Sequence, residues 1–251
     1  MKKTMKAVAA LMLTVTVVCV TGCGSSNGNQ RMVESAADKP QNLNGHNYVD
    51  LGLPNGTLWA TCNVGADSPE SYGDYFAWGE TQPKSSYFEK NYKHAYYETE
   101  FEVPVYIKYT LGSHYLQGES TEPDNLTVLE AVDDAATSNW GNGWHTPTTD
   151  EWNELLANCT REWTTRNHVK GMLFTGKNGN NIFLPAGGVY YEMDTPKADK
   201  FGNYLTSSLY RDRNDRSSYC YVFSRLDEGD LSGSDRFIGG SVRPVCSGTQ
   251  R

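Results

Sequence analysis

The chain has 251 residues, of which 38% are hydrophobic and 21% are charged, and its formal net charge is −8. That length accommodates one large β-rich domain or two small ones. The acidic balance lacks the basic surface that nucleic-acid binding requires, so nucleic acid is excluded as an expected partner.

The first residues have the pattern of an export signal. An apolar run of 14 residues, Ala7 to Val20, follows the lysines at positions 2, 3 and 6. A membrane-spanning helix needs ~20 apolar residues, so this run fits a signal peptide better than a membrane anchor. We therefore expect residues 1–22 to be a signal peptide.

The signal ends in Val20-Thr21-Gly22-Cys23, which resembles the lipobox of bacterial lipoproteins. The resemblance implies cleavage before Cys23, lipidation of its thiol and amine, and attachment to a membrane. A plain secretory signal with a chance cysteine is the alternative. Gly24 follows in place of the aspartate that retains enterobacterial lipoproteins in the inner membrane, so by analogy we expect the outer membrane or cell surface.

The next segment, residues 23–45, is polar and has almost no large apolar side chains. Such a segment buries too little surface to offset its ordering entropy, so it predicts a flexible tether. We expect a single domain over residues 46–247 and a short tail at 248–251.

The domain opens with a predicted β-hairpin. Tyr48–Leu53 and Thr57–Cys62 are rich in β-forming residues and flank Asn55-Gly56, the strongest short signal for a hairpin turn. The following region, Thr81–Asn125, is irregular and rich in tyrosine, and Glu102–Lys108 is its best candidate strand. Long loops of this kind often carry binding surfaces.

The clearest helix start in the sequence lies at Thr148. Thr148 and Glu151 have the spacing of a capping box, in which each side chain satisfies a free backbone N–H of the other residue. Trp152, Leu155, Leu156 and Cys159 then recur at helical spacing and predict one apolar face. We expect this short helix to plug the core of a β-rich domain.

Several strands should follow the helix. A second Asn-Gly turn separates Val169–Thr175 from Asn181–Pro185 and predicts another hairpin. Further strands are predicted at Asn203–Ser208, Tyr219–Ser224 and Ser241–Cys246. Pro244 lacks a backbone donor, so the last strand should have an open side there. The whole predicts an α+β domain with a twisted, mainly antiparallel sheet of short strands, one clear capped helix and long irregular loops.

Cysteine usage fits an exported protein. Cys19 leaves with the signal and Cys23 carries the lipid, which leaves four candidates for disulfides: Cys62, Cys159, Cys220 and Cys246. Four cysteines allow three connectivities, and the sequence leaves them open. We expect at least one bridge to reach Cys246, and the spacings make a structural zinc site improbable.

Taken together, the motifs resemble the Fibrobacter succinogenes major paralogous domain, a family common in lipoproteins of gut Bacteroidota. The most specific match is DDAATSNWGNGWHTPTTDEWNELLANC. The matching segments are Tyr48–Ala66, Tyr72–Glu80, Asp133–Cys159, Asn178–Ala186, Asn203–Ser208 and Gly240–Cys246.

That family is in turn similar to C-type-lectin-like folds, including the formylglycine-generating enzymes. The resemblance implies a compact twisted sheet with its ends close together, a helix packed on it and variable loops, but it implies no established activity. His145-Thr146 stands where Arg-Met is usual, Leu205 stands where Trp is usual, and Cys220 is an addition. These departures put any shared pocket chemistry in doubt.

Loop tyrosines are the candidate ligand-binding residues, because aromatic rings present large apolar faces with polar tips that suit sugars. The candidates are Tyr96, Tyr97, Tyr115, Tyr190, Tyr191 and Tyr210.

No cofactor is expected, and calcium is the one metal weighed. Asp227, Asp230 and Asp235 lie in an acidic, glycine-containing stretch that is a weak calcium candidate, with a solvated turn as the alternative. Glu122-Pro123-Asp124 resembles the calcium triplet of true C-type lectins, but it precedes the helix where the lectin triplet follows it.

We therefore expect a lipid-anchored, non-catalytic binding or adhesion module for glycan or protein. One alternative is a structural subunit of a surface fibre or envelope assembly. The other is a thiol enzyme, for which a pairing of Cys159 with His145 is the remaining catalytic arrangement. The formylglycine-generating motif itself is not matched around Cys220 or Cys246.

Overall fold

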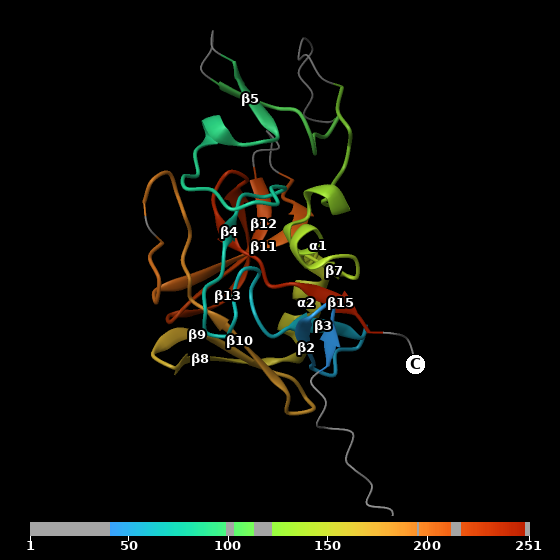
Figure 1. The fold of residues 1–251 in the computed structure, drawn as a ribbon, viewed down its shortest axis with the longest axis vertical. Helices are drawn as coiled ribbons and strands as arrows, with labels where there is room; N and C mark the ends of the chain where they lie inside the picture. Colours follow the sequence, from blue (N-terminus) through green and yellow to red (C-terminus); the bar gives the residue numbers. More distant parts are fainter. Residues whose placement is uncertain (1–40, 99–102, 113–121, 195, 212–216, 249–251) are drawn as a thin grey trace, which may run out of the picture. The chain divides into compact units, whose positions relative to one another are not determined.

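The computed structural model describes residues 41–98, 103–112, 122–194, 196–211 and 217–248, and every structural statement below concerns these ranges. They form mainly antiparallel β-sheet with two α-helices (Figure 1), so the predicted α+β, mainly-sheet class is confirmed. The signal sequence and Cys23 lie outside the described residues.

One five-stranded sheet joins the two ends of the described chain. Its order is β1-β2-β3-β15-β7, in which β3 pairs with β2 on one side and with the last strand, β15, on the other. The bounds are β1 Asn42–Leu43, β2 His46–Asp50, β3 Thr57–Ala60, β15 Val245–Ser247 and β7 Trp144–His145. The predicted first hairpin is confirmed, since Tyr48 pairs with Ala60 in antiparallel register.

Residues 42–45, which the sequence assigned to the tether, belong to the folded part of the described chain. Asn42 and Leu43 pair with β2, and the Leu43 carbonyl accepts a hydrogen bond of 3.1 Å from the Trp144 indole. Asn44 donates to the carbonyls of residues 140 and 142. These contacts make residues 42–45 part of the folded body, because each polar side chain in the segment has a specific partner there.

The middle of the chain forms a three-stranded sheet in the order β10-β9-β8. β9, Val169–Thr175, and β10, Asn181–Pro185, have the predicted bounds and pair antiparallel around the Asn-Gly turn. β8, Thr160–Arg166, was missing from the prediction because its exposed and half-buried residues give no continuous apolar face.

A second five-stranded sheet has the order β13-β12-β11-β14-β4. Its bounds are β13 Asp227–Asp235, β12 Ser217–Ser224, β11 Phe201–Leu209, β14 Gly240–Ser241 and β4 Tyr75–Phe76. β11 and β12 confirm two predicted strands. All pairings are antiparallel except that of β11 with β14.

The last predicted strand, Ser241–Cys246, is in fact two. β14 belongs to one five-stranded sheet and β15 to the other, and Val242–Pro244 carries the chain between them. The Val242 and Pro244 carbonyls accept hydrogen bonds from Val64 and Ala60. Pro244 therefore falls in this link, where its missing donor leaves no strand pairing unmade.

The helix predicted after Thr148 is α2, Thr149–Asn158, and both hydrogen bonds of its capping box are present. Trp152 and Leu155 are fully buried. Trp152 packs against Trp59 and stacks on Tyr221, with ring centroids 4.8 Å apart in each case. We call this buried cluster, which joins α2 to three sheets, the helix core.

The shorter helix α1, Ala135–Trp140, is capped by a buried aspartate. The Asp134 carboxylate accepts hydrogen bonds from the backbone N–H of Thr137 at 2.9 Å and from that of Thr146 at 2.9 Å. It also accepts from the Thr146 hydroxyl. One side chain therefore starts α1 and ties it to the strand that precedes α2.

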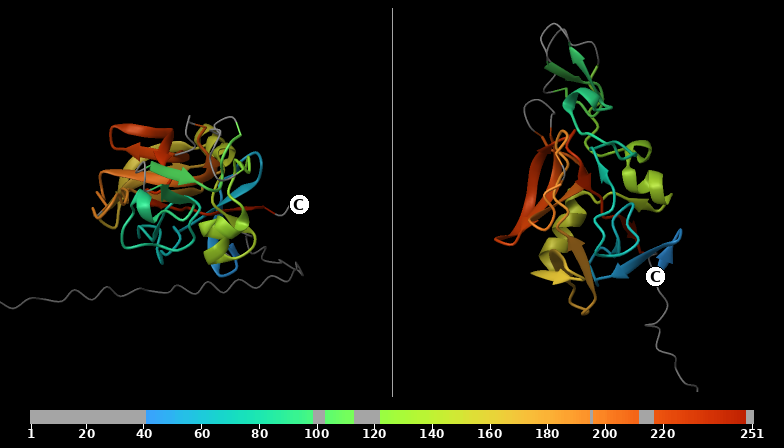
Figure 2. Two further views of the ribbon diagram at one scale, coloured as in Figure 1. Left: turned by 90° about the horizontal axis from the view of Figure 1, so that it is seen from above. Right: turned by 60° about the vertical axis from the view of Figure 1, so that its left-hand side comes forward.

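The tyrosine-rich region contains a strand at the predicted place, since β6, Val103–Tyr106, falls within Glu102–Lys108. β6 forms a hairpin with β5, Ala95–Glu98, preceded by a 3-10 turn at Glu89–Asn91. A second 3-10 turn at Ala131–Asp133 lies before α1. The hairpin lies at the top of Figure 1, and Figure 2 shows it away from α2.

Most of the rings beside this hairpin are buried rather than offered to a ligand. We name this group the aromatic lobe; its buried members are Tyr75, Trp78, Tyr87, Tyr92, Tyr106, Tyr109 and Phe237. Arg236 lies among them, fully buried, with its guanidinium carbon 5.1 Å from the Trp78 ring and 4.9 Å from the Tyr106 ring.

Candidate functional site

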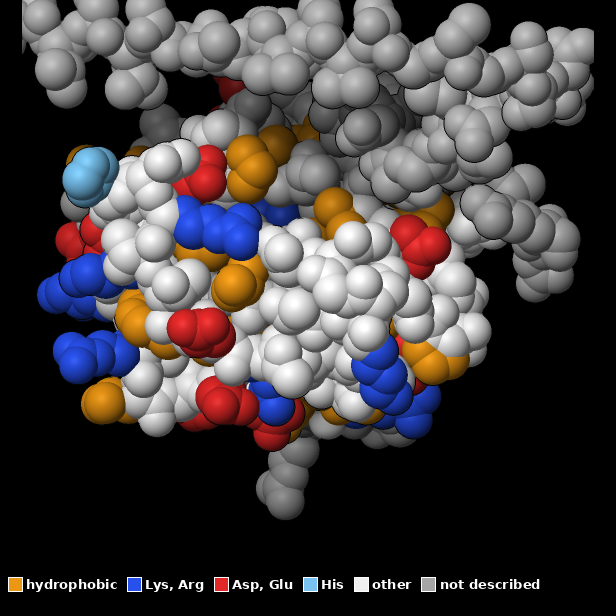
Figure 3. Space-filling model, turned by 90° about the horizontal axis from the view of Figure 1, so that it is seen from below, with side chains coloured by type: hydrophobic (Ala, Val, Ile, Leu, Met, Phe, Trp, Pro, Cys, Tyr) orange, Lys and Arg blue, Asp and Glu red, His pale blue; other side chains and the backbone are white. Residues whose placement is uncertain are grey.

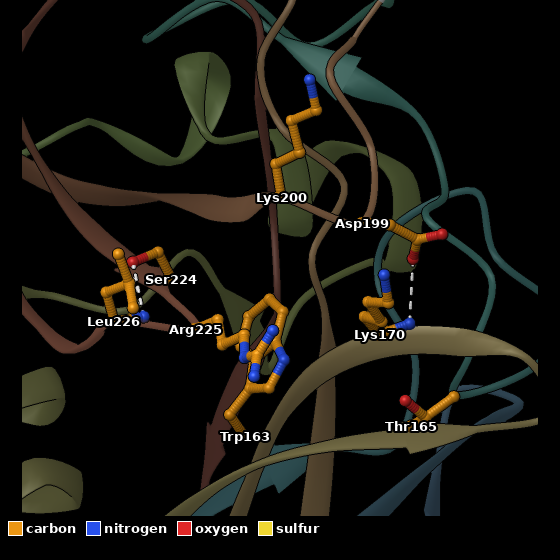
Figure 4. Close-up of a pocket in the computed structure, with 8 residues that line it drawn as sticks. All are labelled: Trp163, Thr165, Lys170, Asp199, Lys200, Ser224, Arg225 and Leu226. Atoms are coloured by element: carbon orange, nitrogen blue, oxygen red, sulfur yellow. Dashed lines mark hydrogen bonds between the residues drawn. The ribbon is translucent and has the colours of Figure 1, made fainter.

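A surface groove of about 570 Å³ lies between three parts of the chain. Strands β8 and β9 form one wall, the β12–β13 turn forms another, and the segment before β11 closes the third side (Figure 4). Its lining residues are Trp163, Thr165, Lys170, Asp199, Lys200, Ser224, Arg225 and Leu226.

Trp163 is the aromatic element of the groove. It lies on β8, half-buried, and packs edge-on against Phe223 of the helix core with ring centroids 6.2 Å apart. The antiparallel register places it opposite Met172 on β9. Anchored on one side and lining the groove on the other, its ring supplies an apolar surface among polar neighbours.

Asp199 is held at the groove by the backbone around it. Its Oδ1 accepts a hydrogen bond of 2.9 Å from the Lys170 backbone N–H and one of 3.2 Å from the Tyr72 hydroxyl. Its own N–H donates to the Ala186 carbonyl, and its φ of 63° lies in the left-handed region that aspartate tolerates better than most residues. Burial, together with the Asp199 carboxylate, raises the pKa of Tyr72 to about 12, so the hydroxyl stays a donor.

Three cationic side chains surround the groove: Lys170, Lys200 and Arg225. By contrast, the two arginines of β8 donate hydrogen bonds to groups outside the groove. Arg161 donates to the Gly229 carbonyl at 3.2 Å, and Arg166 donates to the Asn181 side chain at 2.8 Å.

The groove has one prominent apolar edge besides Trp163. Leu226, at the tip of the β12–β13 turn, is 95% exposed, and its backbone N–H is held by the Ser224 hydroxyl at 3.2 Å. Figure 3, seen from below, shows Lys and Arg side chains along the left-hand edge of that face with hydrophobic side chains between them. A ligand with both an apolar face and polar groups would find partners of both kinds here.

The tyrosines predicted to bind a ligand do not come together. Tyr96 is 39% exposed on β5 and Tyr191 is 43% exposed beside Phe237, while Tyr190 packs between Tyr75 and Tyr87. Tyr210 packs edge-on against Tyr219 near the far end of β11. Tyr115 and the side chain of Tyr97 lie outside the described residues. Of the four whose side chains the structure describes, two are partly exposed and two pack against other rings.

The acidic stretch weighed for calcium is strand β13 rather than a loop or turn. Asp227 and Asp230 each accept a hydrogen bond from a nearby backbone N–H, and the register places Asp230 opposite Val222 and Asp235 opposite Ser217. Across the described ranges, no group of three or more His, Cys, Asp or Glu residues is placed to hold a metal ion.

The lectin-like triplet also has another role. Both carboxylate oxygens of Asp124 accept backbone hydrogen bonds, from Tyr109 at 2.7 Å and from Thr110 at 3.0 Å. Asp124 therefore closes the loop between residues 109 and 126, because Leu126 N–H also donates to it.

In the described part of the chain, Cys62, Cys159, Cys220 and Cys246 are free thiols, so the expected bridge to Cys246 is not formed with any of the other three. Their places in the sheets explain this: Cys246 pairs with Leu58 and Trp144, and Cys220 pairs with Leu205 and Ser232. No strand register puts one of these cysteines opposite another.

The three buried thiols among them have little nucleophilic character. Burial raises the pKa of Cys159, Cys220 and Cys246 to about 11, so all three are protonated near neutral pH. His145, weighed as a base for Cys159, instead contacts Glu151 at 2.8 Å. The thiol-enzyme alternative therefore gains no geometric support at these residues.

No protein-family model, curated protein or solved structure matches the chain. Among the helices that the structure describes, none is both long enough and apolar enough to span a membrane.

None of the groove residues was singled out for binding from sequence. They are scattered over residues 163–226. One local signal was available: Trp163 is the one aromatic residue of the otherwise polar strand TREWTTR.

Proposed function

We propose that the chain is a glycan-binding module that uses the groove around Trp163. The observation that carries the proposal is an anchored tryptophan that lines an open groove of about 570 Å³ among hydroxyl and charged side chains. Ligand sites typically occupy ~300–1,000 Å³ and combine apolar walls with a few polar groups, and this groove meets that description.

Sugar rings have the matching chemistry. One face of a pyranose carries C–H groups, which pack against an aromatic ring, while its hydroxyls seek donors and acceptors around the rim. Trp163 would supply the platform, Thr165 and Ser224 the hydroxyl partners, and Asp199 an acceptor. Oδ1 of Asp199 already has two donors, so Oδ2 is the oxygen for which no partner is described.

The C-type-lectin-like fold and the location at the outer membrane or cell surface are parts of the same proposal. A C-type-lectin-like body fits a helix packed on sheet and first and last strands that share one sheet. Lipidation at Cys23 would hold the groove at the outer membrane or cell surface, where extracellular glycans are found. The resemblance to the major paralogous domain family is what motivates both inferences.

The fibre-subunit alternative gains less from the structure. β13 is an edge strand of its sheet, and it carries Asp227, Glu228, Asp230 and Asp235. Like charges on an exposed edge oppose pairing with a second copy, because edge-to-edge association would bring these carboxylates together. Self-association through this edge is therefore disfavoured.

A glycan array probed with the purified full chain in detergent tests the proposal. We expect binding to one class of glycan and a loss of about tenfold or more in affinity for Trp163→Ala, since central aromatic contacts often contribute over 1.4 kcal/mol. Tyr191→Ala is the matched control, because Tyr191 is an exposed aromatic outside the groove.

Two results would contradict the proposal. The first is an array on which the intact chain binds no glycan. The second is a bound glycan whose affinity falls with Tyr191→Ala and stays unchanged with Trp163→Ala, which would return the site to the tyrosine-bearing loops.

A further inference from the structure

We propose that the groove selects glycans that bear an anionic group on the sugar ring, either the carboxylate of a uronic acid or a sulfate ester. This inference rests on the proposed glycan-binding function and names its substrate class. Three observations support it: cationic side chains surround Trp163, these side chains have no described hydrogen-bond or ion-pair partner, and strand register places them at the groove.

The groove is positive although the chain is acidic. Three cationic side chains and one carboxylate line it, whereas the chain as a whole has a net charge of −8. The charged side chains of the lining therefore sum to a positive charge, so an anion at the groove meets a sign opposite to that of the chain as a whole. Binding of a neutral sugar would not require a positively charged groove on an acidic chain.

The cations are also available. Within the described part of the chain, the side chains of Lys170, Lys200 and Arg225 make no hydrogen bond or ion pair, and Figure 4 shows no interaction from them. By contrast, Lys84, Lys93 and Lys108 all have carboxylate partners. Unpaired cations gathered around an aromatic ring are suited to an external anion.

Strand register sets these cations in two places. Thr165 lies directly opposite Lys170 on the β8–β9 ladder. On the other wall Phe201 lies opposite Ser224, so Lys200 and Arg225, one residue further out on each strand, leave the sheet at the same end. In Figure 4 the Arg225 side chain overlaps Trp163, Lys170 lies to the right of them, and Lys200 extends toward the top of the view.

This layout assigns a role to each side. A sugar stacked on Trp163 would direct its anionic substituent toward Arg225, because a guanidinium can donate two parallel hydrogen bonds to a carboxylate or sulfate, and Lys200 would add a second positive charge further along the lining. Asp199 lies on the Lys170 side and repels an anion there, so that side suits a sugar hydroxyl. The groove would therefore select sugars by their charge and fix the orientation of the sugar ring.

The experiment measures affinity by titration calorimetry with the purified full chain in detergent. The probes are three oligosaccharides of equal length and linkage: a neutral one, a uronic-acid one and a sulfated one. We expect the chain to bind an anionic probe about tenfold more tightly than the neutral one, with affinity falling as salt is added.

Arg225→Gln and Lys200→Gln should each remove about tenfold of the affinity for the anionic probe and change neutral binding less than about twofold. Lys177→Gln is the matched control, because Lys177 is an exposed lysine in the β9–β10 turn that does not line the groove. Circular dichroism and melting temperature establish that each variant is folded.

The outcomes separate the inference from the function on which it rests. Preference for the uronic acid or for the sulfate supports the inference and identifies the anion. Equal affinity for neutral and anionic probes, or anionic binding that Arg225→Gln and Lys200→Gln leave unchanged, overturns it while glycan binding stands. Failure to bind any glycan on the wider array overturns both.

Discussion

The helix core and the aromatic lobe are held together by different physics. In the helix core, Trp152 and Leu155 are buried among aliphatic and aromatic side chains, and Trp152 packs against the rings of Trp59 and Tyr221. In the aromatic lobe, rings surround charges and hydroxyls: Tyr92 donates to the Trp78 carbonyl at 2.8 Å, and Arg236 donates to the carbonyls of residues 108 and 109.

Asp133 is the central charge beside the aromatic lobe. Its buried carboxylate lies 2.6 Å from Lys93 Nζ, 2.6 Å from Lys108 Nζ and 2.9 Å from the Tyr109 hydroxyl. Burial acts to raise the pKa of Asp133, but hydrogen bonds from Lys108, Lys93 and Tyr109 outweigh it and lower the pKa to about 2. The difference teaches that one region depends on apolar burial and the other on satisfied polar partners.

The largest effect should follow a cavity in the helix core. Trp152→Ala removes a fully buried ring that contacts Trp59 and Tyr221, and we expect a loss of about 4 kcal/mol in the free energy of unfolding. Urea denaturation followed by fluorescence measures it. Trp152→Phe keeps most of the volume and should cost markedly less; equal losses for the two variants would contradict the cavity argument.

The next effect should separate the two regions. Asp133→Asn leaves Lys93 without its carboxylate and Lys108 with Glu130 alone, and we expect a loss on the order of 2 kcal/mol, less than for a fully buried pair because Lys93 is 52% exposed. Hydrogen exchange should speed up near residues 92–109 and stay slow in α2. The matched control is Glu130→Gln, since Glu130 is 50% exposed and binds only Lys108. Uniformly faster exchange would contradict a local role.

The lowered pKa of Asp133 predicts that the stability of the fold decreases at acidic pH. Its folded pKa of about 2 lies below the unfolded value of ~3.9, so its contribution is complete above pH ~4 and is lost as the pH falls toward 2. Melting temperature measured over this range should fall more steeply for the wild-type chain than for Asp133→Asn. Parallel curves for the wild-type chain and Asp133→Asn would show that other carboxylates cause the loss of stability at acidic pH.

A smaller effect should come from the start of α2. Thr148→Ala removes the hydroxyl that accepts from the Glu151 N–H at 3.2 Å, and we expect a loss of about 1 kcal/mol. Thr148→Ser retains the cap and should recover most of that loss in chemical denaturation. If Ser were as costly as Ala, the methyl contact rather than the cap would be the stabilising element.

The smallest effect should be a pH dependence at the same helix end. Burial acts to lower the pKa of His145, but its hydrogen bond to Glu151 outweighs that and raises it. The stabilisation is therefore complete below the unfolded pKa of ~6.5 and is lost as the pH rises through the folded value.

We expect roughly 0.5 kcal/mol from this pair, because both side chains are partly solvated. His145→Gln should flatten the melting-temperature profile between about pH 6 and 8. The control, His168→Asn, changes an exposed histidine whose φ of 68° asparagine tolerates, and it should leave the profile unchanged.

Sequence patterns predicted the helix core better than any other part. Periodic apolar residues and the capping box located α2, and two Asn-Gly turns located two hairpins, because these signals act over a few residues. The same local reasoning missed β8 and β13, whose polar sequences become strands through pairing with β9 and β12. It also did not identify which tyrosines are buried, since burial of a ring in the aromatic lobe depends on distant partners.

By itself, the sequence determined the export signal pattern, the mainly-sheet class, the capped helix and its buried face, because each follows from spacing along the chain. Only the tertiary structure decided that the cysteines remain apart, that Asp133 collects two lysines, and that Trp163, Asp199 and Arg225 line one groove. Those residues are separated by tens of positions, and sheet register alone brings them to the same place.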